Sequence, residues 1–335
     1  MRILFAGSPG IAVPSLVRLA AEHEMVGVLT NPDAPRGRSK RPEPTEVAVA
    51  AAGLPAAGPS APPPILKPER LDAVVRAAIE ALRPDLLVAV AYGKIFGPKF
   101  LALFPLGGLN VHPSLLPRHR GCAPIPAAIL NRDPETGVCV QRLAPEMDAG
   151  DILAVERLSL DFTETTESLT LLAAERGAVL LSSVVAALEA GTAVAVPQAA
   201  DGATYCGMLR KEDGRLDWTR SAPELDARIR AFHPWPGAST THGSSILNVL
   251  EARPYAGTAA FPSAGPGFVA GIDKAAGILV QTGDGLLALR RLQYETKKPL
   301  DWRSFLNGAR DFIGSTLGAD ESSRRAKAEA HETLQ

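Results

Sequence analysis

The sequence predicts an α/β protein with a doubly wound, mainly parallel sheet, followed by a smaller β-rich domain. In the first half, apolar segments of strand length alternate with helical patterns, which is typical of parallel sheets covered by helices. These strands are apolar on both faces, as strands buried on both sides are. From about Arg210 the pattern changes to short β-like runs separated by glycine and proline, which indicates a small barrel or sandwich.

The composition agrees with a globular chain of one large or two smaller domains. The chain has 335 residues, of which 46% are hydrophobic and 21% charged, and its formal net charge is -1, which excludes a uniformly basic protein. Its 3 cysteines form no Cys-x-x-Cys pair, so we expect neither a disulfide framework nor a cysteine-rich zinc site, and a reducing cytoplasm fits. The first residues read as a strand rather than a leader, and no run reaches the roughly 18 apolar residues of a membrane span.

Regular elements can be assigned in order along the first half. The strands are expected at 2–6, 25–30 and 86–91, and a further apolar run carries Asn110 and His112. The helices are expected from Gly10 to about Ala21, from Glu46 to Ala52 and from Glu69 to Leu82, whereas the proline-rich stretch 53–68 is expected to be irregular.

Three of these strands end in residues suited to a binding site. Gly7–Gly10, Tyr92–Gly93 and Asn110–His112 all follow apolar runs, and ligands of doubly wound sheets bind at the carboxyl ends of the strands. Asn110 and His112 are two positions apart, so they project from the same face of their strand. Asp148 lies on a predicted tight loop. An amide donor, a titratable ring and a carboxylate can together stabilise and deprotonate the intermediate of an acyl transfer.

Two other interpretations of these strand ends were weighed. An Asn-x-His pair on a strand can be purely structural, and the residues alone leave the two interpretations about equal. The glycines of Gly7–Gly10 resemble a dinucleotide fingerprint, but the spacing is Gly-x-x-Gly, and Pro9 lacks one of the backbone N–H groups that would hold a phosphate. A nicotinamide or nucleotide enzyme is therefore disfavoured.

The second half supplies the predicted domain division. A short strand is expected at 151–160, and a long helix at Thr163–Ala190 with a capping-box-like start and Gly191 as its stop. A helix at about 222–232 precedes short strands at 245–251, 267–271, 277–282 and 285–292. The predicted divisions are a catalytic domain at 1–190, a linker at 191–208, a second domain at 209–318 and a charged tail at 319–335.

One loop has a strong local charge. Arg36, Arg38, Lys40 and Arg41 place four positive charges in six residues, between Pro35 and Pro42. A solvated surface loop is the usual explanation of such a run. The alternative is an arm that contacts the phosphates of a nucleic acid, such as an irregular RNA end.

Motifs along the whole chain resemble the methionyl-tRNA formyltransferase family. Those of the first half are Phe5-Ala-Gly-Ser-Pro9, Asn31-Pro-Asp-x-Pro-x-Gly-Arg38, Ala91-Tyr-Gly93, Asn110-Val-His-Pro-Ser-Leu-Leu-Pro-x-x-Arg-Gly121, Ala123-Pro-Ile125, Glu135-Thr-Gly137 and Met147-Asp-x-Gly-Asp151. Those of the second half are Ala203-Thr-Tyr205, Lys211-Glu212, Leu216-Asp-Trp218 and Ile229-Arg-Ala-Phe-x-Pro-Trp-Pro236. The second group separates the tRNA enzyme from the shorter glycinamide ribonucleotide transferase.

The resemblance implies a Rossmann-like formyltransferase domain and a C-terminal β-barrel (OB-like) domain that helps to hold tRNA. It implies transfer of a formyl group from 10-formyltetrahydrofolate to the α-amino group of methionyl-initiator-tRNA, with Asn110, His112 and Asp148 as the catalytic residues. An enzyme of this chemistry with another amine acceptor, or water, is the alternative. We expect no metal, no membrane and a cytoplasmic monomer.

The resemblance also implies binding residues. Those for the folate are Val90, Ala91, Tyr92, Gly93, Ile95, Ser114, Leu115, Leu116, Pro117, Leu143 and Met147. Those for the RNA are Arg36, Arg38, Lys40, Arg41 and Lys211. The sequence departs from the family pattern at Glu146-Met147, at Met208 and at Thr45–Ala48, which bears on local folate and tRNA contacts rather than on the reacting residues.

Overall fold

A computed structural model describes residues 1–35, 41–54, 62–199, 201–257 and 264–319. The chain forms two compact units. The first consists of Met1–Ile125, Glu135–Ser159 and Ser168–Gly207, and the second consists of Pro126–Pro134, Leu160–Glu167 and Met208–Gln335.

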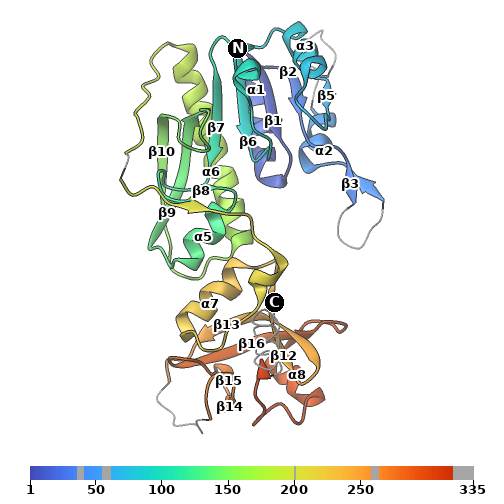
Figure 1. Ribbon diagram of the computed structural model, residues 1–335, viewed down its shortest axis with the longest axis vertical. Coiled ribbons are helices and arrows are strands. Elements are labelled where there is room, and N and C mark those ends of the chain that lie inside the picture. Colours follow the sequence, from blue (N-terminus) through green and yellow to red (C-terminus); the bar gives the residue numbers. More distant parts are fainter. Residues whose placement is uncertain (36–40, 55–61, 200, 258–263, 320–335) are drawn as a thin grey trace, which may run out of the picture. The chain divides into compact units, whose positions relative to one another are not determined.

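The first unit is built on a seven-stranded sheet in the order β10-β9-β7-β6-β1-β2-β5 (Figure 1). Five strands are parallel: β1 (Arg2–Gly7), β2 (Glu24–Leu29), β5 (Ile65–Leu66), β6 (Leu86–Val90) and β7 (Gly108–His112). β9 (Glu135–Arg142) and β10 (Ile152–Ser159) run antiparallel at one edge. β1 and β6 are almost entirely buried, as their apolar residues on both faces predicted. The predicted fold class is confirmed.

Two helices of this unit begin where a side chain, that of Thr45 or of Asp72, caps the first turn. The helices of this unit are α1 (Val13–Glu22, after a short 3-10 turn at Gly10–Ala12), α2 (Glu46–Ala52), α3 (Ala73–Ala81), α4 (Pro98–Leu101) and nearly all of α6 (Thr166–Glu189). Most of α5 (Pro124–Leu130) belongs to the second unit. The helix predicted from Glu69 begins only at Ala73, because the Asp72 carboxylate accepts a hydrogen bond from the Val75 amide at 3.0 Å. Likewise, the predicted start at Thr163 is wrong: Asp161 there accepts hydrogen bonds from Thr163 in a separate turn.

Helix α6 is the single helix among the described residues that is long and apolar enough to cross a membrane by length and composition. Its packing identifies it as a core helix of the first unit. A Cβ atom at Gly177 would lie 3.0 Å from the Val111 side chain and 3.3 Å from that of Val138, so the helix backbone lies directly against β7 and β9. Leu169, Leu181 and Val185 are buried on the same helix.

Several short or central elements escaped the sequence analysis. The stretch 53–68 is not wholly irregular, because Ile65–Leu66 adds β5 to the sheet beside Val28–Leu29. β9 was missed altogether, although it pairs with both β7 and β10. The small strands β3 (Ala34–Pro35) and β4 (Pro42–Glu43) pair with each other, as do β8 (Arg120–Gly121) and β11 (Tyr205–Cys206). A two-residue strand has no periodicity for sequence analysis to detect.

The second unit has a six-stranded antiparallel sheet. Its order is β12 (Ala238–His242), β13 (Ser245–Pro254), β16 (Leu286–Tyr294), β15 (Gly277–Gln281) and β14 (Val269–Asp273), with β17 (Leu300–Asp301) on β16. Helices α7 (Ala222–Ala231) and α8 (Trp302–Gly308) contact this sheet, and a short 3-10 turn lies at Lys211–Gly214. Leu225 and Ile229 of α7 and Phe305 of α8 enter the sheet's buried apolar core. Four of these six strands were predicted, and β12 and β17 were missed.

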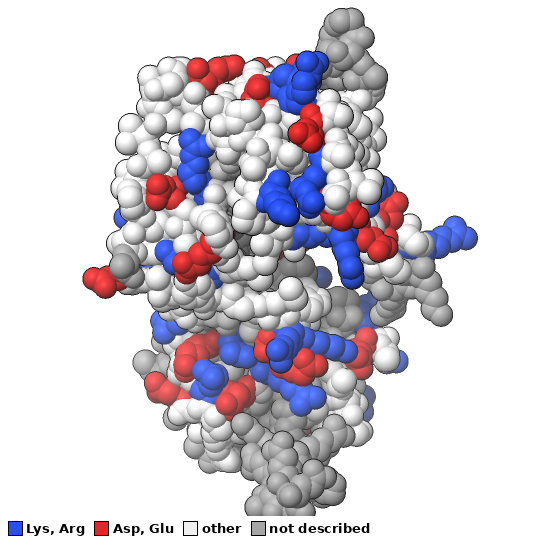
Figure 2. All heavy atoms as spheres, turned by 45° about the horizontal axis from the view of Figure 1, so that its top comes forward, with Lys and Arg blue, Asp and Glu red and all other residues white. Residues whose placement is uncertain are grey.

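Charged side chains of both signs are interspersed on the face shown in Figure 2, which fits the small net charge. Residues 320–335, most of the predicted charged tail, lie outside the described residues.

Candidate active site

Strand register brings the predicted site segments of the first unit together. Gly7 pairs with Val90, and Ala89 pairs with Asn110, so the carboxyl ends of β1, β6 and β7 are neighbours. On the other side of β7, Gln141 of β9 pairs with Asn110. The chain then leaves β9 in a loop, residues 143–151, which carries Asp148.

Three polar side chains converge on the Asp148 carboxylate. The Asn110 amide donates to Oδ1 of Asp148 at 3.2 Å, and the Gln141 amide donates to the same oxygen at 3.0 Å. Nδ1 of His112 lies 3.5 Å from that oxygen, and the Gly121 backbone amide donates to Oδ2 at 2.9 Å. The structure therefore brings Asn110, His112 and Asp148 into one cluster, although Asp148 is 38 residues from Asn110 in the chain.

The second ring nitrogen of His112 fixes which protons the ring carries. Nε2 lies 2.9 Å from the backbone carbonyl oxygen of His119, which can only accept, so Nε2 carries a proton. A proton on Nδ1 then makes the ring cationic and faces it toward Asp148. The ring is 4% exposed, and this burial lowers the pKa of His112, whereas the charge of Asp148 and the His119 carbonyl act to raise it. The charge of the ring thus depends on Asp148 staying close and ionised.

The loop that presents Asp148 is held tightly against β9. Asp148 has a φ of 54°, in the left-handed region that most residues avoid. Two residues later, a Cβ at Gly150 would lie 1.9 Å from the Arg142 carbonyl oxygen, so only glycine fits there. The glycine of the Met147–Asp151 motif therefore serves the close approach of the loop to the strand.

The first group of folate candidates follows β6. Val90 and Tyr92 are buried, Ala91 and Gly93 have positive φ values of 48° and 82°, and the Ile95 side chain is 77% exposed. Tyr92 begins a row of aromatic rings that continues through Phe96, Phe100 and Phe104, with neighbouring centroids 5.5, 5.1 and 5.7 Å apart. The first pair is stacked and the other two are tilted. Asn31 donates to the Tyr92 carbonyl at 3.1 Å, which ties this turn to the end of β2.

The second group of folate candidates lies around the turn after β7 and in the Asp148 loop. Ser114 is fully buried and donates to the Arg118 carbonyl at 2.7 Å, so its hydroxyl closes the turn that contains Leu115, Leu116 and Pro117. Leu143 packs against the apolar cluster that includes Tyr92, whereas the Met147 side chain is 48% exposed. The candidates of this group thus lie in the turn after β7 and in the loop after β9, and their contact with folate stays a prediction.

The candidates for RNA contacts are only partly described. Arg36, Arg38 and Lys40 lie outside the described residues. Arg41 is exposed beside β4, and Lys211 is exposed at the start of the 3-10 turn Lys211–Gly214 of the second unit.

Sequence analysis missed three side chains of this network. Gln141 lies on the unrecognised strand β9, Arg120 was only part of a motif, and Gln198 lies in the stretch predicted as a linker. Gln198 donates to the backbone carbonyls of Asp148 and Gly150, each at 2.8 Å. A glutamine in a proline- and alanine-rich segment gives no periodic signal, and only the folded chain shows its partners.

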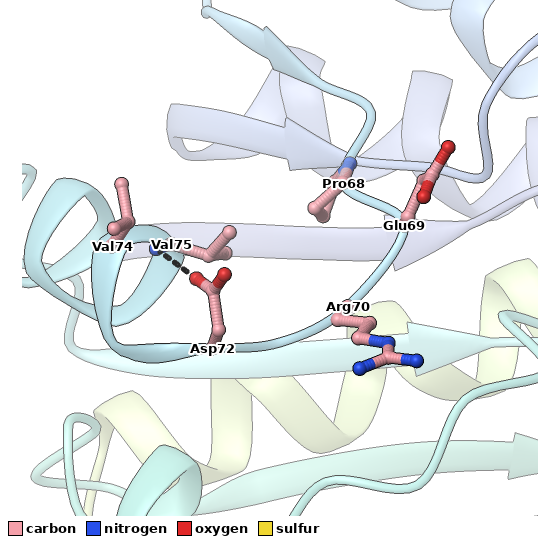
Figure 3. A pocket seen from close by; sticks show the side chains of 6 residues that line it. All are labelled: Pro68, Glu69, Arg70, Asp72, Val74 and Val75. Atoms are coloured by element: carbon pink, nitrogen blue, oxygen red, sulfur yellow. Dashed lines mark hydrogen bonds between the residues drawn. The ribbon is translucent and has the colours of Figure 1, made fainter.

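A separate surface pocket does not contain this cluster. Its lining is Pro68, Glu69, Arg70, Asp72, Val74 and Val75, around the start of α3, and Figure 3 shows Asp72 turned back to the Val75 amide. The Asp72 carboxylate in this pocket is thus engaged in capping helix α3. Among the residues that the structure describes, no group of three or more His, Cys, Asp or Glu side chains is placed to hold a metal ion.

Sequence comparisons relate both units to one family. The family model described as "Formyl transferase" matches residues 1–185, and "Formyl transferase, C-terminal domain" matches residues 208–310. A methionyl-tRNA formyltransferase of Treponema denticola is 48% identical over 93% of this chain and 98% of its own length. Another, of Symbiobacterium thermophilum, is 39% identical over 98% of each chain.

Solved structures share the fold at lower identity. The sugar 3N-formyl transferase WlaRD, solved with dTDP and 5-N-formyl-THF, has a TM-score of 0.63 at 15% identity, over 89% of this chain and 99% of its own. HypX from Aquifex aeolicus with tetrahydrofolic acid has a TM-score of 0.62 at 18% identity; 93% of this chain is covered, but the chain spans only 48% of HypX. Near-full-length identity of up to 49% to several curated relatives, together with both domain matches, decides the assignment. The chain belongs to the methionyl-tRNA formyltransferase family.

Proposed function

We propose that this protein transfers the formyl group of 10-formyltetrahydrofolate to the α-amino group of methionyl-initiator-tRNA, giving N-formylmethionyl-tRNA for translation initiation. The observation that carries the proposal is the convergence of the Asn110 amide and the His112 ring on one oxygen of Asp148, at 3.2 and 3.5 Å. Family membership over nearly the whole chain supports the choice of acceptor.

The three residues would act on the two charges that the reaction creates. When the neutral amine attacks the formyl carbon, the formyl oxygen becomes negative and the amine nitrogen positive. Asn110 uses one N–H for Asp148 and has a second to donate to the oxygen, and the His112 cation adds a charge-assisted hydrogen bond.

Asp148 would then handle the proton. The carboxylate takes a proton from the attached amine, directly or through water, while the bond from the formyl carbon to N10 breaks and N10 receives a proton. One N–H remains on the product amide, so the atoms balance without a covalent enzyme intermediate.

The binding residues belong to the same proposal. The folate would lie against the segment after β6, where Ile95 exposes an apolar side chain, and against the Asp148 loop, where Met147 does. The basic residues Arg36, Arg38, Lys40 and Arg41, with Lys211, would contact the tRNA phosphates. In this proposal the enzyme acts in the cytoplasm as a monomer.

One assay tests the proposal. The protein is incubated with 10-formyltetrahydrofolate and methionyl-initiator-tRNA, and the base-stable formyl group on methionine is measured. We expect transfer that requires both substrates and that is lost in Asp148→Asn. Hydrolysis of the folate, or formylation of an amino sugar, without formylation of the tRNA would contradict the proposed acceptor and favour the alternative.

A further inference from the structure

The segment 196–206, which the sequence predicted to be part of a linker, contacts the Asp148 site of the first unit. Val196 and Ile152 exchange two backbone hydrogen bonds of 2.8 Å, which anchors one end of the segment to β10. At its other end, Tyr205–Cys206 pairs in parallel with Arg120–Gly121. Gly121 is the residue whose backbone amide donates to Asp148. Gln198 lies between these two anchors.

The Gln198 amide is aimed at the backbone on both sides of Ala149. Its Nε2 donates to the carbonyl oxygens of Asp148 and Gly150, each at 2.8 Å, and lies 3.2 Å from Oε1 of Gln141. All three partners are acceptors, so the nitrogen must face them. One side chain thereby holds the turn in which Asp148 has its left-handed φ.

Arg120 fixes the other end of the same amide. Its guanidinium donates to Oε1 of Gln198 from Nε at 3.1 Å and from Nη2 at 2.8 Å. An arginine can only donate, so a flipped Gln198 would present its N–H groups to N–H groups. Arg120 is 8% exposed, and its third contact is the Tyr205 hydroxyl at 3.0 Å, which in turn donates to Glu146 at 2.9 Å.

We propose that Gln198 is a positioning residue for Asp148, and that Arg120 acts by orienting Gln198. Gln198 holds the backbone of the Asp148 loop, so it would act on the carboxylate through that backbone, and Arg120 would act through Gln198. The inference rests on the proposed formyl transfer for its kinetic readout. Its physical reason is that a carboxylate misplaced by about 1 Å can cost roughly 100-fold in rate, because the reacting groups lose alignment.

The first experiment compares Gln198→Ala with Gln198→Glu. The glutamate keeps the size and still accepts from Arg120, but it turns a carboxylate oxygen toward the carbonyls of Asp148 and Gly150. We expect kcat to fall about 10- to 100-fold in both variants, with KM for tRNA within about twofold, and with the thermal midpoint of the glutamate variant close to wild type because Arg120 keeps its partner.

A matched control removes the same type of bond elsewhere. Gln293 of the second unit donates its amide to the Lys297 carbonyl at 2.7 Å, so Gln293→Ala also frees one loop carbonyl. Its kcat is expected to equal that of the wild type. An equal loss of kcat in Gln293→Ala would mean that the effect reports general loosening, and would overturn the positioning role.

A double-mutant cycle tests the part played by Arg120. If Arg120 acts by orienting Gln198, then Arg120→Lys combined with Gln198→Ala should be no slower than Gln198→Ala alone. If the loss of kcat in the double variant equals the product of the losses in the two single variants, the two residues act independently, and the orienting role of Arg120 is contradicted.

A readout that needs no turnover completes the test. The His112 ring is titrated by NMR in the wild type and in Gln198→Ala. When Asp148 moves away, the ring loses the charge that raises its pKa, so the pKa of His112 should fall in the variant. An unchanged titration and an unchanged kcat would overturn the inference. A wild-type protein that formylates no methionyl-tRNA would instead refute the proposed function, while the titration would still decide the role of Gln198.

Discussion

Two buried aspartates, one in each unit, are stabilised in opposite ways. The Asp226 side chain is 7% exposed and is paired with two arginines: Arg230 at 2.8 Å and Arg253 at 3.1 Å. The Asp148 side chain is 13% exposed, and the hydrogen bonds it accepts come from the neutral groups Asn110, Gln141 and the Gly121 amide. Among the described residues, its cationic partner is His112, which is charged only when protonated.

The difference separates a carboxylate held in a permanent ion pair from one that we propose to be reactive. Guanidinium groups keep their protons at any accessible pH, so Asp226 is neutralised permanently and has no proton to exchange with its partners. Asp148 instead faces a ring whose charge can change, and neutral donors hold it in place without neutralising it. The comparison teaches that the titratable partner, rather than burial, identifies the carboxylate that can do chemistry.

The largest effect is expected at Asp148 and His112. Asp148→Asn and His112→Ala should each lower kcat by at least about 10³-fold, because proton transfer and oxyanion stabilisation each contribute on that order. The free energy of unfolding should change little in comparison. Single-turnover formylation and urea unfolding measure the two quantities. Near-normal formylation by either variant would remove that residue from the mechanism.

The converse is expected at Asp226. Asp226→Asn leaves the buried guanidinium of Arg230 without its counter-ion and should lower the free energy of unfolding by about 3–5 kcal/mol. The kcat per folded molecule should stay near that of the wild type, because Asp226 belongs to the second unit and is paired there with Arg230 and Arg253. Urea unfolding followed by the second unit's tryptophans gives the stability. A variant that is stable but inactive would break the comparison between the two aspartates.

A moderate effect is expected from the basic loop. The change replaces Arg36, Arg38, Lys40 and Arg41 with glutamine, and it should weaken tRNA binding. It should also reduce the slope of the logarithm of the tRNA association constant against the logarithm of salt concentration by up to roughly 3, since each phosphate contact releases counterions. The kcat at saturating tRNA should change little. Filter binding across a salt series measures the slope.

The control for the basic loop neutralises exposed arginines elsewhere in the first unit. Arg18, Arg157 and Arg176 lie on α1, β10 and α6 and form ion pairs with glutamates. Replacing them with glutamine should leave the salt slope nearly unchanged. If both variants flatten the slope equally per charge, the loop has no special role in binding RNA.

The smallest effect is expected at Tyr92. Its buried hydroxyl has no hydrogen-bond partner among the residues that the structure describes, and burial raises the pKa of Tyr92 from 10.0 to about 12. The pKa of Tyr92 is higher in the folded state than in the unfolded state. The contribution of the neutral Tyr92 side chain to the free energy of unfolding is therefore complete below pH 10 and is lost as the pH rises through 12. Each pKa unit corresponds to about 1.4 kcal/mol. Tyr92→Phe should remove this part of the alkaline loss while changing stability at pH 7 by less than about 1 kcal/mol. The free energies of unfolding of the wild type and of Tyr92→Phe, measured at pH 7 and at pH 11, test both expectations.

Local sequence patterns predicted the long elements and the type of fold. Buried strands such as β1 and β6 are continuous apolar runs, and the four predicted strands of the second unit are bounded by glycine and proline, so periodicity and turn residues suffice. Helix starts were less well predicted, because the capping residue, Asp72 for α3, decides among several candidates. The predicted domain division and the binding roles stay predictions.

The sequence by itself determined that Asn110 and His112 project from one face of a strand, and the tertiary structure decided which residues they contact. Asn110 and His112 share a face because a strand alternates its side chains, which is a local rule. The approach of Asp148, the neighbouring Gln141 and the support of Gln198 depend on pairings across the sheet and on the segment 196–206. Such contacts join residues far apart in the chain, so their positions follow from the packing of the whole unit rather than from any local pattern.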